Sequence, residues 1–136
     1  MDLSELIRKA QEAKEKAYVP YSGFHVGAAL LCKDGTIFTG CNIENSAYGP
    51  TNCAERTAIF KAVSEGYREF QVIAIISDSK ELTSPCGVCR QVMAEFCDPD
   101  SFFIVVAESE SDYEIRTLRK LLPEGFGSGN LADCIQ

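Results

Sequence analysis

Four residues in two short segments have the types and spacing of a catalytic metal site. Cys53 lies two residues before Glu55, and Cys86 lies three residues before Cys89. Both segments fall where a helix is expected to begin. Three thiolates leave one position of a tetrahedral Zn²⁺ ion open, and catalytic zinc sites keep that position for water. A glutamate beside such a water can transfer its protons, so these residues favour a catalytic zinc centre.

Each part of this pattern also has a simpler interpretation. Cys86 and Cys89 alone could form a redox pair. Asn52 and Glu55 have the spacing of a capping box, in which the glutamate only fixes the start of a helix. The cysteines could also bind zinc in a structural or interaction module, but such sites normally have four protein ligands and no fourth is evident beside the three. The only histidine, His25, is expected to be structural.

The charge of such a centre indicates a role for an arginine. Three thiolates and Zn²⁺ sum to a net charge of −1, which would make the metal a weaker acid toward its water. Arg56 and Arg90 lie in or beside the expected first helical turns, and either could donate hydrogen bonds to the sulfurs. We favour Arg56, because it follows Cys53 by three residues. The positive ends of the two helices would further favour thiolate over thiol.

Length and charge restrict the class of protein. The 136 residues suit one domain, spanning 1–136, that can bury a core without disulfides. A net charge of −7 argues against a nucleic-acid partner and favours a small neutral substrate. No apolar run approaches the roughly 20 residues that span a bilayer, and the N-terminus lacks a signal-peptide pattern. We therefore expect a cytoplasmic protein without a membrane partner.

The seven cysteines cannot all form intrachain disulfides, because their number is odd. Four of them have no motif around them: Cys32, Cys41, Cys97 and Cys134. We expect these four to be small buried apolar residues.

The apolar pattern predicts alternating strands and helices around the two segments. An amphipathic helix is expected over 3–17, followed by a hairpin of strands 26–32 and 36–41 about Asp34-Gly35. Later elements are a helix over 53–64, a buried strand over 71–77, a helix from Ser84 (N-cap) and Pro85 to Phe96, a strand over 102–107, an edge strand over 112–116 and a short helix over 117–122. This order predicts an α/β fold, a three-layer α/β/α sandwich with a mixed central sheet.

The residues resemble the signature of zinc-dependent cytidine deaminases. That signature pairs Cys-x-Glu, here Cys53-Ala54-Glu55-Arg56, with Pro-Cys-x-x-Cys, here Pro85 to Arg90-Gln91. The segments Tyr18–Phe24, Val26–Ala29 and Gly40–Asn45 resemble further blocks of the small, single-domain members. The resemblance covers most of residues 18–95.

This resemblance implies specific roles for the residues. Cys53, Cys86 and Cys89 would hold one Zn²⁺ per subunit, with Arg56 beside the sulfurs, and Glu55 would be the proton shuttle. Phe24 would lie against the pyrimidine, Asn42 and Glu44 would bind the ribose, and the Ala54 N–H and Ser84 carbonyl would contact the base. Small members are typically homotetramers, and Phe126 would reach a neighbouring subunit's site. The segment 47–51 varies within the family, which leaves any role of Tyr48 open.

The activity implied is hydrolytic deamination of cytidine and 2′-deoxycytidine to the uracil nucleosides and ammonia, in pyrimidine salvage. The alternative within this chemistry is another aminated heterocycle, such as a blasticidin-type nucleoside antibiotic or a mononucleotide. Asn42 and Glu44 alternate by two and can project to one side of an extended segment. A carboxylate there accepts hydroxyl hydrogen bonds but repels phosphate, which favours a nucleoside.

Overall fold

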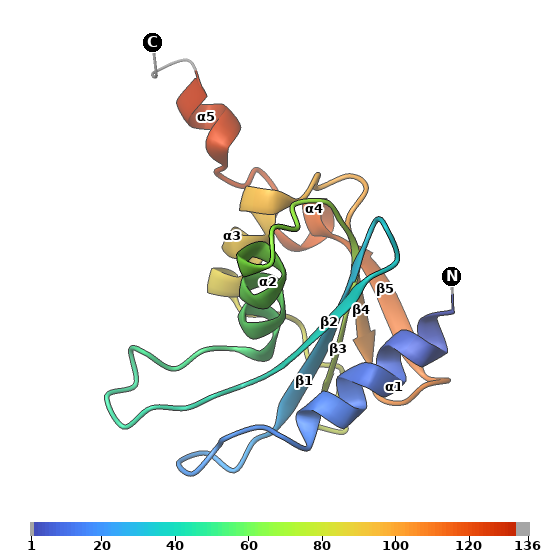
Figure 1. Ribbon diagram of the computed structural model, residues 1–136, viewed down its shortest axis with the longest axis vertical. Helices are drawn as coiled ribbons and strands as arrows, with labels where there is room; N and C mark the ends of the chain where they lie inside the picture. The colour runs from blue at the N-terminus through green and yellow to red at the C-terminus, as the bar shows by residue number, and fades with distance from the viewer. Residues whose placement is uncertain (1, 133–136) are drawn as a thin grey trace.

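The computed structural model describes residues 2–132, and these form a mixed sheet between two layers of helices (Figure 1). The sheet order is β2-β1-β3-β4-β5, with β3 and β4 parallel and all other neighbours antiparallel. In chain order the elements are α1 (Leu3–Lys14), β1 (Val26–Cys32), β2 (Ile37–Cys41), α2 (Ala54–Ser64), β3 (Phe70–Ser77), α3 (Gly87–Phe96), β4 (Phe103–Ala107), β5 (Tyr113–Thr117), α4 (Leu118–Leu121) and α5 (Ser128–Ala132).

The two faces of the sheet are buried under different helices because successive side chains of a strand point to opposite faces. Ala29 and Leu31 of β1 pack in one apolar cluster with the buried face of α1. Ala28 and Leu30 pack in the other cluster, with residues of α2 and α3. Figure 1 shows α1 on one side of the sheet and α2 and α3 on the other. The predicted three-layer fold with a mixed sheet is confirmed, and cover on both faces explains the nearly continuous apolar runs of β1 and β3.

Two glycines allow the helices to lie in backbone contact with the sheet. A Cβ atom on Gly27 of β1 would lie 2.0 Å from the carbonyl oxygen of Ala10 in α1. A Cβ atom on Gly40 of β2 would lie 2.5 Å from the carbonyl oxygen of Ala54, at the start of α2. Both distances are far below van der Waals contact, so these positions require glycine.

Several predicted element boundaries differ from the structure. The first helix ends at Lys14 rather than at residue 17, and the helix over 128–132 was not expected. The most consequential difference is α3, which begins at Gly87 with Cys86 as its N-cap, so Ser84 and Pro85 precede the helix. Within the described residues, no helix is long and apolar enough to cross a membrane.

Candidate metal centre and active-site cleft

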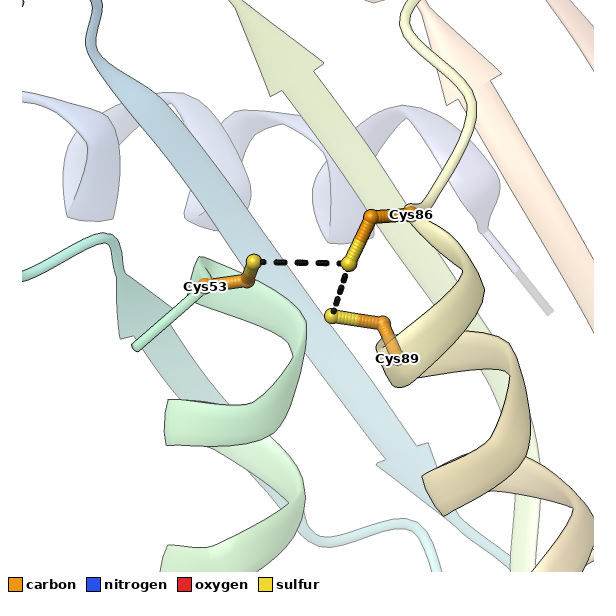
Figure 2. A group of neighbouring side chains, drawn as sticks. All are labelled: Cys53, Cys86 and Cys89. Atoms are coloured by element: carbon orange, nitrogen blue, oxygen red, sulfur yellow. Dashed lines mark hydrogen bonds between the residues drawn. The ribbon is translucent and has the colours of Figure 1, made fainter. Parts of the chain in front are cut away.

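The three predicted zinc ligands meet where two helices begin. Cys53 and Cys86 are the N-cap residues of α2 and α3, in extended backbone conformation, and neither side chain caps its own helix. Cys89 lies in the first turn of α3. Figure 2 shows the three thiols pointing toward one another from the two helices. The Cys86 sulfur lies 3.6 Å from that of Cys53 and 3.4 Å from that of Cys89.

These positions fit a tetrahedral zinc ion. Zinc–sulfur bonds of about 2.3 Å place two sulfurs of one tetrahedral site about 3.8 Å apart. The three Sγ atoms lie within 4.8 Å of one another, so one ion can contact all three after small side-chain adjustments. Cys89 is buried, Cys53 is partly buried and Cys86 is exposed, which leaves one side of the cluster facing outward. Three thiolates with an accessible fourth position are the ligand set of a catalytic rather than a closed structural site.

Hydrogen bonds within the cluster favour ionisation of one thiol. The Cys89 thiol and the Arg56 guanidinium stabilise the Cys53 thiolate and lower the pKa of Cys53 to about 5. The pKa of Cys89 is raised, because its proton is shared with the Cys53 sulfur and because the thiol is buried. The N-terminal ends of α2 and α3 add favourable electrostatics for a thiolate at both caps. The centre is therefore prepared to bind a cation through anionic sulfur.

The two candidate arginines have different roles. Arg56 Nη2 donates a hydrogen bond to Cys53 Sγ at 3.2 Å, as favoured from the sequence. Arg90 instead donates to two backbone carbonyls, from Nε to Pro85 and from Nη1 to Leu121, at 2.7 Å each. Arg90 therefore connects the segment before α3 to the end of α4, and Arg56 is the arginine that offsets the charge of the sulfurs.

Glu55 is a buried carboxyl group beside the cysteine cluster. It lies in the first turn of α2 and is only 4% exposed. Burial raises the pKa of its carboxyl group from 4.5 to about 7. A carboxyl group with a pKa near neutrality can both accept and release a proton at physiological pH. The alternative of a capping box is wrong, because Cys53 is the N-cap and the Asn52 side chain donates to Thr57 Oγ1.

A cleft of about 230 Å³ lies between the cysteine cluster and the first strands. It gathers residues from the end of the segment before β1, the segment after β2, the start of α2 and the segment before α3. Its lining residues are Phe24, Val26, Asn42, Thr51, Asn52, Cys53, Ala54, Glu55, Thr83, Ser84 and Cys86. The Ala54 N–H belongs to the first residue of α2, where no intrahelical acceptor exists, so it is free for a ligand.

Asn42 joins two sides of this cleft through its amide. Its Nδ2 donates to the Phe24 carbonyl at 2.8 Å, and its Oδ1 accepts from the Val26 N–H at 2.9 Å. The amide is thereby fixed in orientation, while one N–H and one lone pair remain for a ligand.

Glu44 lies just outside the cleft and is held by the segment before β1. Its Oε1 accepts hydrogen bonds from the backbone N–H groups of Tyr21 and Ser22, at 3.0 and 3.1 Å, and its Oε2 accepts from Ser22 Oγ. The Ser22 hydroxyl bond and these amide bonds lower the pKa of Glu44 below its usual value of 4.5. This carboxylate is therefore ionised at neutral pH and fixed in position.

Comparison with known proteins decides the family. Residues 1–105 match the model of the cytidine and deoxycytidylate deaminase zinc-binding region, and this span includes the cysteine cluster and Glu55. The chain belongs to this family. The resemblance read from the sequence is confirmed, as is zinc as the cofactor suited to the three cysteines.

Relatives of the deaminase match along nearly the whole chain. A cytidine deaminase from Sporosarcina psychrophila is 54% identical over 132 residues, which are 97% of this chain and 96% of the relative. One from Halalkalibacterium halodurans is 51% identical over 98% of this chain and all of the relative. The crystal structure of cytidine deaminase from Burkholderia pseudomallei, 47% identical, has a TM-score of 0.88 over 93% of this chain and all of that chain.

Not all of the residues expected to bind substrate meet in this deaminase chain. Phe24, Asn42, Ala54 and Ser84 line the cleft with Glu55, and Glu44 lies beside it. Phe126 lies elsewhere: its ring is 57% exposed, and its carbonyl accepts a hydrogen bond from Gln91 of α3. Its expected role in a neighbouring subunit stays a prediction. Tyr48 is 76% exposed and contacts Tyr21 edge to face, with ring centres 6.4 Å apart.

The remaining predictions concern residues outside the cleft of the deaminase. Cys32 and Cys97 are buried as expected, Cys41 is only partly buried, and Cys134 lies outside the described residues. His25 is structural in this chain, with Nδ1 lying 2.6 Å from Asp78 Oδ2. Sequence reasoning missed Thr51 and Thr83 in the cleft wall, because isolated threonines in polar loops carry no spacing signal.

Proposed function

We propose that this chain catalyses hydrolytic deamination of cytidine and 2′-deoxycytidine to uridine and 2′-deoxyuridine, with release of ammonia. The observation that carries the proposal is a buried carboxyl group with a pKa near neutrality, Glu55, between a cluster of three thiols and a cleft of nucleoside-base size. The family and its relatives support the same chemistry. We take residues 1–136 as one catalytic domain.

The proposed reaction assigns the proton transfers to Glu55. Cys53, Cys86 and Cys89 would hold zinc, which supplies a Lewis acid that lowers the pKa of water toward neutrality. Glu55 accepts a proton as a water oxygen bonds to C4 of the base, and it passes a proton to N3. Glu55 then accepts the proton of the new C4 hydroxyl and passes it to the amino group. The C4–N bond breaks as the C4 carbonyl forms, and ammonia leaves. A carboxyl group with a pKa near the working pH suits both directions of transfer.

The proposed substrate pose places the nucleoside along the cleft wall. The Ala54 N–H and the Ser84 carbonyl contact the base, and Phe24 lies against the pyrimidine. The free N–H and lone pair of Asn42 face the ribose, whose hydroxyls donate to Glu44. The ionised Glu44 would repel a 5′-phosphate, so we propose a nucleoside rather than a nucleotide as the substrate.

The proposed assembly is a homotetramer with its sites near subunit interfaces. The exposed ring of Phe126, which lies outside the cleft of its own chain, supports this assignment. We also propose a cytoplasmic location, since a site made of three free thiols requires a reducing compartment.

The test is loss of the cytosine absorbance when the purified chain is mixed with cytidine, with zinc measured on the same sample. We expect conversion to uridine by protein that carries about one zinc per chain, and slower or no conversion of cytidine monophosphate. Conversion of the nucleotide at the same efficiency would contradict the role of Glu44. Zinc binding without conversion of any aminated pyrimidine would favour a structural module instead.

A further inference from the structure

The backbone of Phe24–Val26 supports the proposed nucleoside side of the cleft, and side chains hold it from two directions. Asn42 bonds the Phe24 carbonyl and the Val26 N–H on one side. Between these two contacts, the backbone N–H of His25 donates to Asp78 Oδ2 at 2.8 Å. Three consecutive residues are thus fixed by two side chains, and Asp78 is the one that does not line the cleft.

Asp78 directly follows β3 and bonds to more than one element. Its own N–H donates to the His25 carbonyl at 3.0 Å, and its Oδ2 lies 2.6 Å from His25 Nδ1. Its Oδ1 lies 3.4 Å from Lys14 Nζ at the end of α1. The hydrogen bond from the His25 N–H, together with those from the His25 ring and Lys14, lowers the pKa of Asp78. An ionised carboxylate therefore joins α1, β3 and the segment that enters β1.

The sheet alone does not fix this segment. The pairing of β1 with β3 begins at Val26 and Ser77, so His25 and Phe24 lie beyond the last ladder pair. Asp78 continues the contact between the two strands by one residue, through its backbone N–H and through its carboxylate, which accepts the His25 N–H. Its neighbour Ser77 hydrogen-bonds Thr83 in the opposite wall of the cleft. The end of β3 therefore holds two parts of the cleft wall, the Phe24–Val26 segment through Asp78 and Thr83 through Ser77.

We propose that Asp78 is a positioning residue for nucleoside binding, acting through the His25 N–H on Phe24 and Asn42. This inference rests on the proposed function. Asp78 does not line the cleft that contains Glu55, so its loss raises the KM for cytidine and leaves kcat nearly unchanged. A charge-assisted hydrogen bond of this kind corresponds to a change in KM of about ten-fold or more.

Three variants separate positioning from a general effect on stability. Asp78→Ala removes every side-chain acceptor, and we expect the ten-fold increase in KM. Asp78→Asn retains one oxygen that can accept from the His25 N–H, and we expect a KM within about three-fold of the parent. Asp100→Ala is the matched control, because Asp100 is also an exposed aspartate bonded by a cation, Arg119, at 2.5 and 2.9 Å, but lies outside the cleft.

Amide hydrogen exchange on the same samples gives a readout that does not depend on turnover. We expect faster exchange over residues 24–26 in Asp78→Ala than in the parent, Asp78→Asn or Asp100→Ala. An unchanged KM, a loss confined to kcat, or unchanged exchange in Asp78→Ala would each overturn the proposal. If the parent does not convert cytidine, the proposed function fails, and exchange still decides whether Asp78 holds this segment.

Discussion

Replacement of Glu55 by glutamine tests the proton transfers most directly. The two side chains have nearly the same shape, so the buried position beside the cysteines stays filled and no cavity forms. An amide cannot accept and release the proton, so we expect kcat for cytidine to fall by about 10²- to 10⁴-fold. The three sulfurs are unchanged, so zinc should remain at about one per chain.

The same substitution, although it lowers kcat, should raise the free energy of unfolding of the metal-free protein at neutral pH. Moving a carboxyl pKa from 4.5 to about 7 corresponds to about 3 kcal/mol, at about 1.4 kcal/mol per pH unit. Because the folded-state pKa is raised, the cost of burying the charged carboxylate is absent below pH 4.5, grows as the pH rises, and is complete above about 7. Glutamine carries no such charge. In metal-free protein, Glu55→Gln should therefore match the parent near pH 4.5 and exceed its free energy of unfolding by up to about 3 kcal/mol at pH 8.

Urea denaturation of chelator-treated parent and variant at pH 4.5 and 8 measures this difference, and absorbance assays of zinc-loaded samples measure kcat. Turnover within ten-fold of the parent would refute Glu55 as the proton shuttle. A variant less stable than the parent at pH 8 would refute the conclusion that burial of the carboxylate is costly.

Two further substitutions test the surroundings of the centre. Arg56→Gln removes the donor to Cys53, and we expect kcat or zinc affinity to fall by about 10- to 100-fold, measured by turnover and by competition with a chelator. Arg119→Gln, on the surface, is the control. Equal kcat and equal zinc affinity in the two variants would contradict the role of Arg56. Gly40→Ala places a Cβ atom 2.5 Å from the start of α2, and overpacking of about 1–3 kcal/mol should lower the melting temperature by several degrees. Gly129 has open space around it, so Gly129→Ala is the control and should leave the melting temperature unchanged. An unchanged melting temperature for Gly40→Ala as well would show that α2 can move away from β2.

The sequence was sufficient for the metal cluster because residue type and spacing carry that information. Cys-x-Glu and Cys-x-x-Cys at two expected helix starts supply three thiols and a carboxyl group with the spacing of a catalytic zinc site. The strands were also predictable, since a sheet covered on both faces leaves nearly continuous apolar runs such as Phe70–Ser77.

Local rules failed where a distant contact decides the conformation. Ser84 and Pro85 have the chemistry of an N-cap and a first helical residue, but the helix begins two residues later. Arg90, which donates to the Pro85 carbonyl, also donates to the Leu121 carbonyl, 31 residues away. This later start places Cys86 at the cap, where its thiol reaches Cys53. Asp78 lies in a polar loop without any motif, and its partner His25 is 53 residues away in the sequence. No periodicity could predict that contact.

The close contacts at Gly27 and Gly40 determine where the substrate range of this enzyme can change. Both helix layers lie directly against the sheet, so neither can shift outward to admit a bulkier amine without losing its packing. The segments 42–53 and 78–86 belong to no helix or ladder of the sheet. Isolated β-bridges at Ile43 and side-chain hydrogen bonds such as those of Asn42 and Thr83 hold them instead. Individual substitutions can replace such bonds. Laboratory evolution toward new substrates should therefore accumulate its mutations in these two loops and leave the helices unchanged.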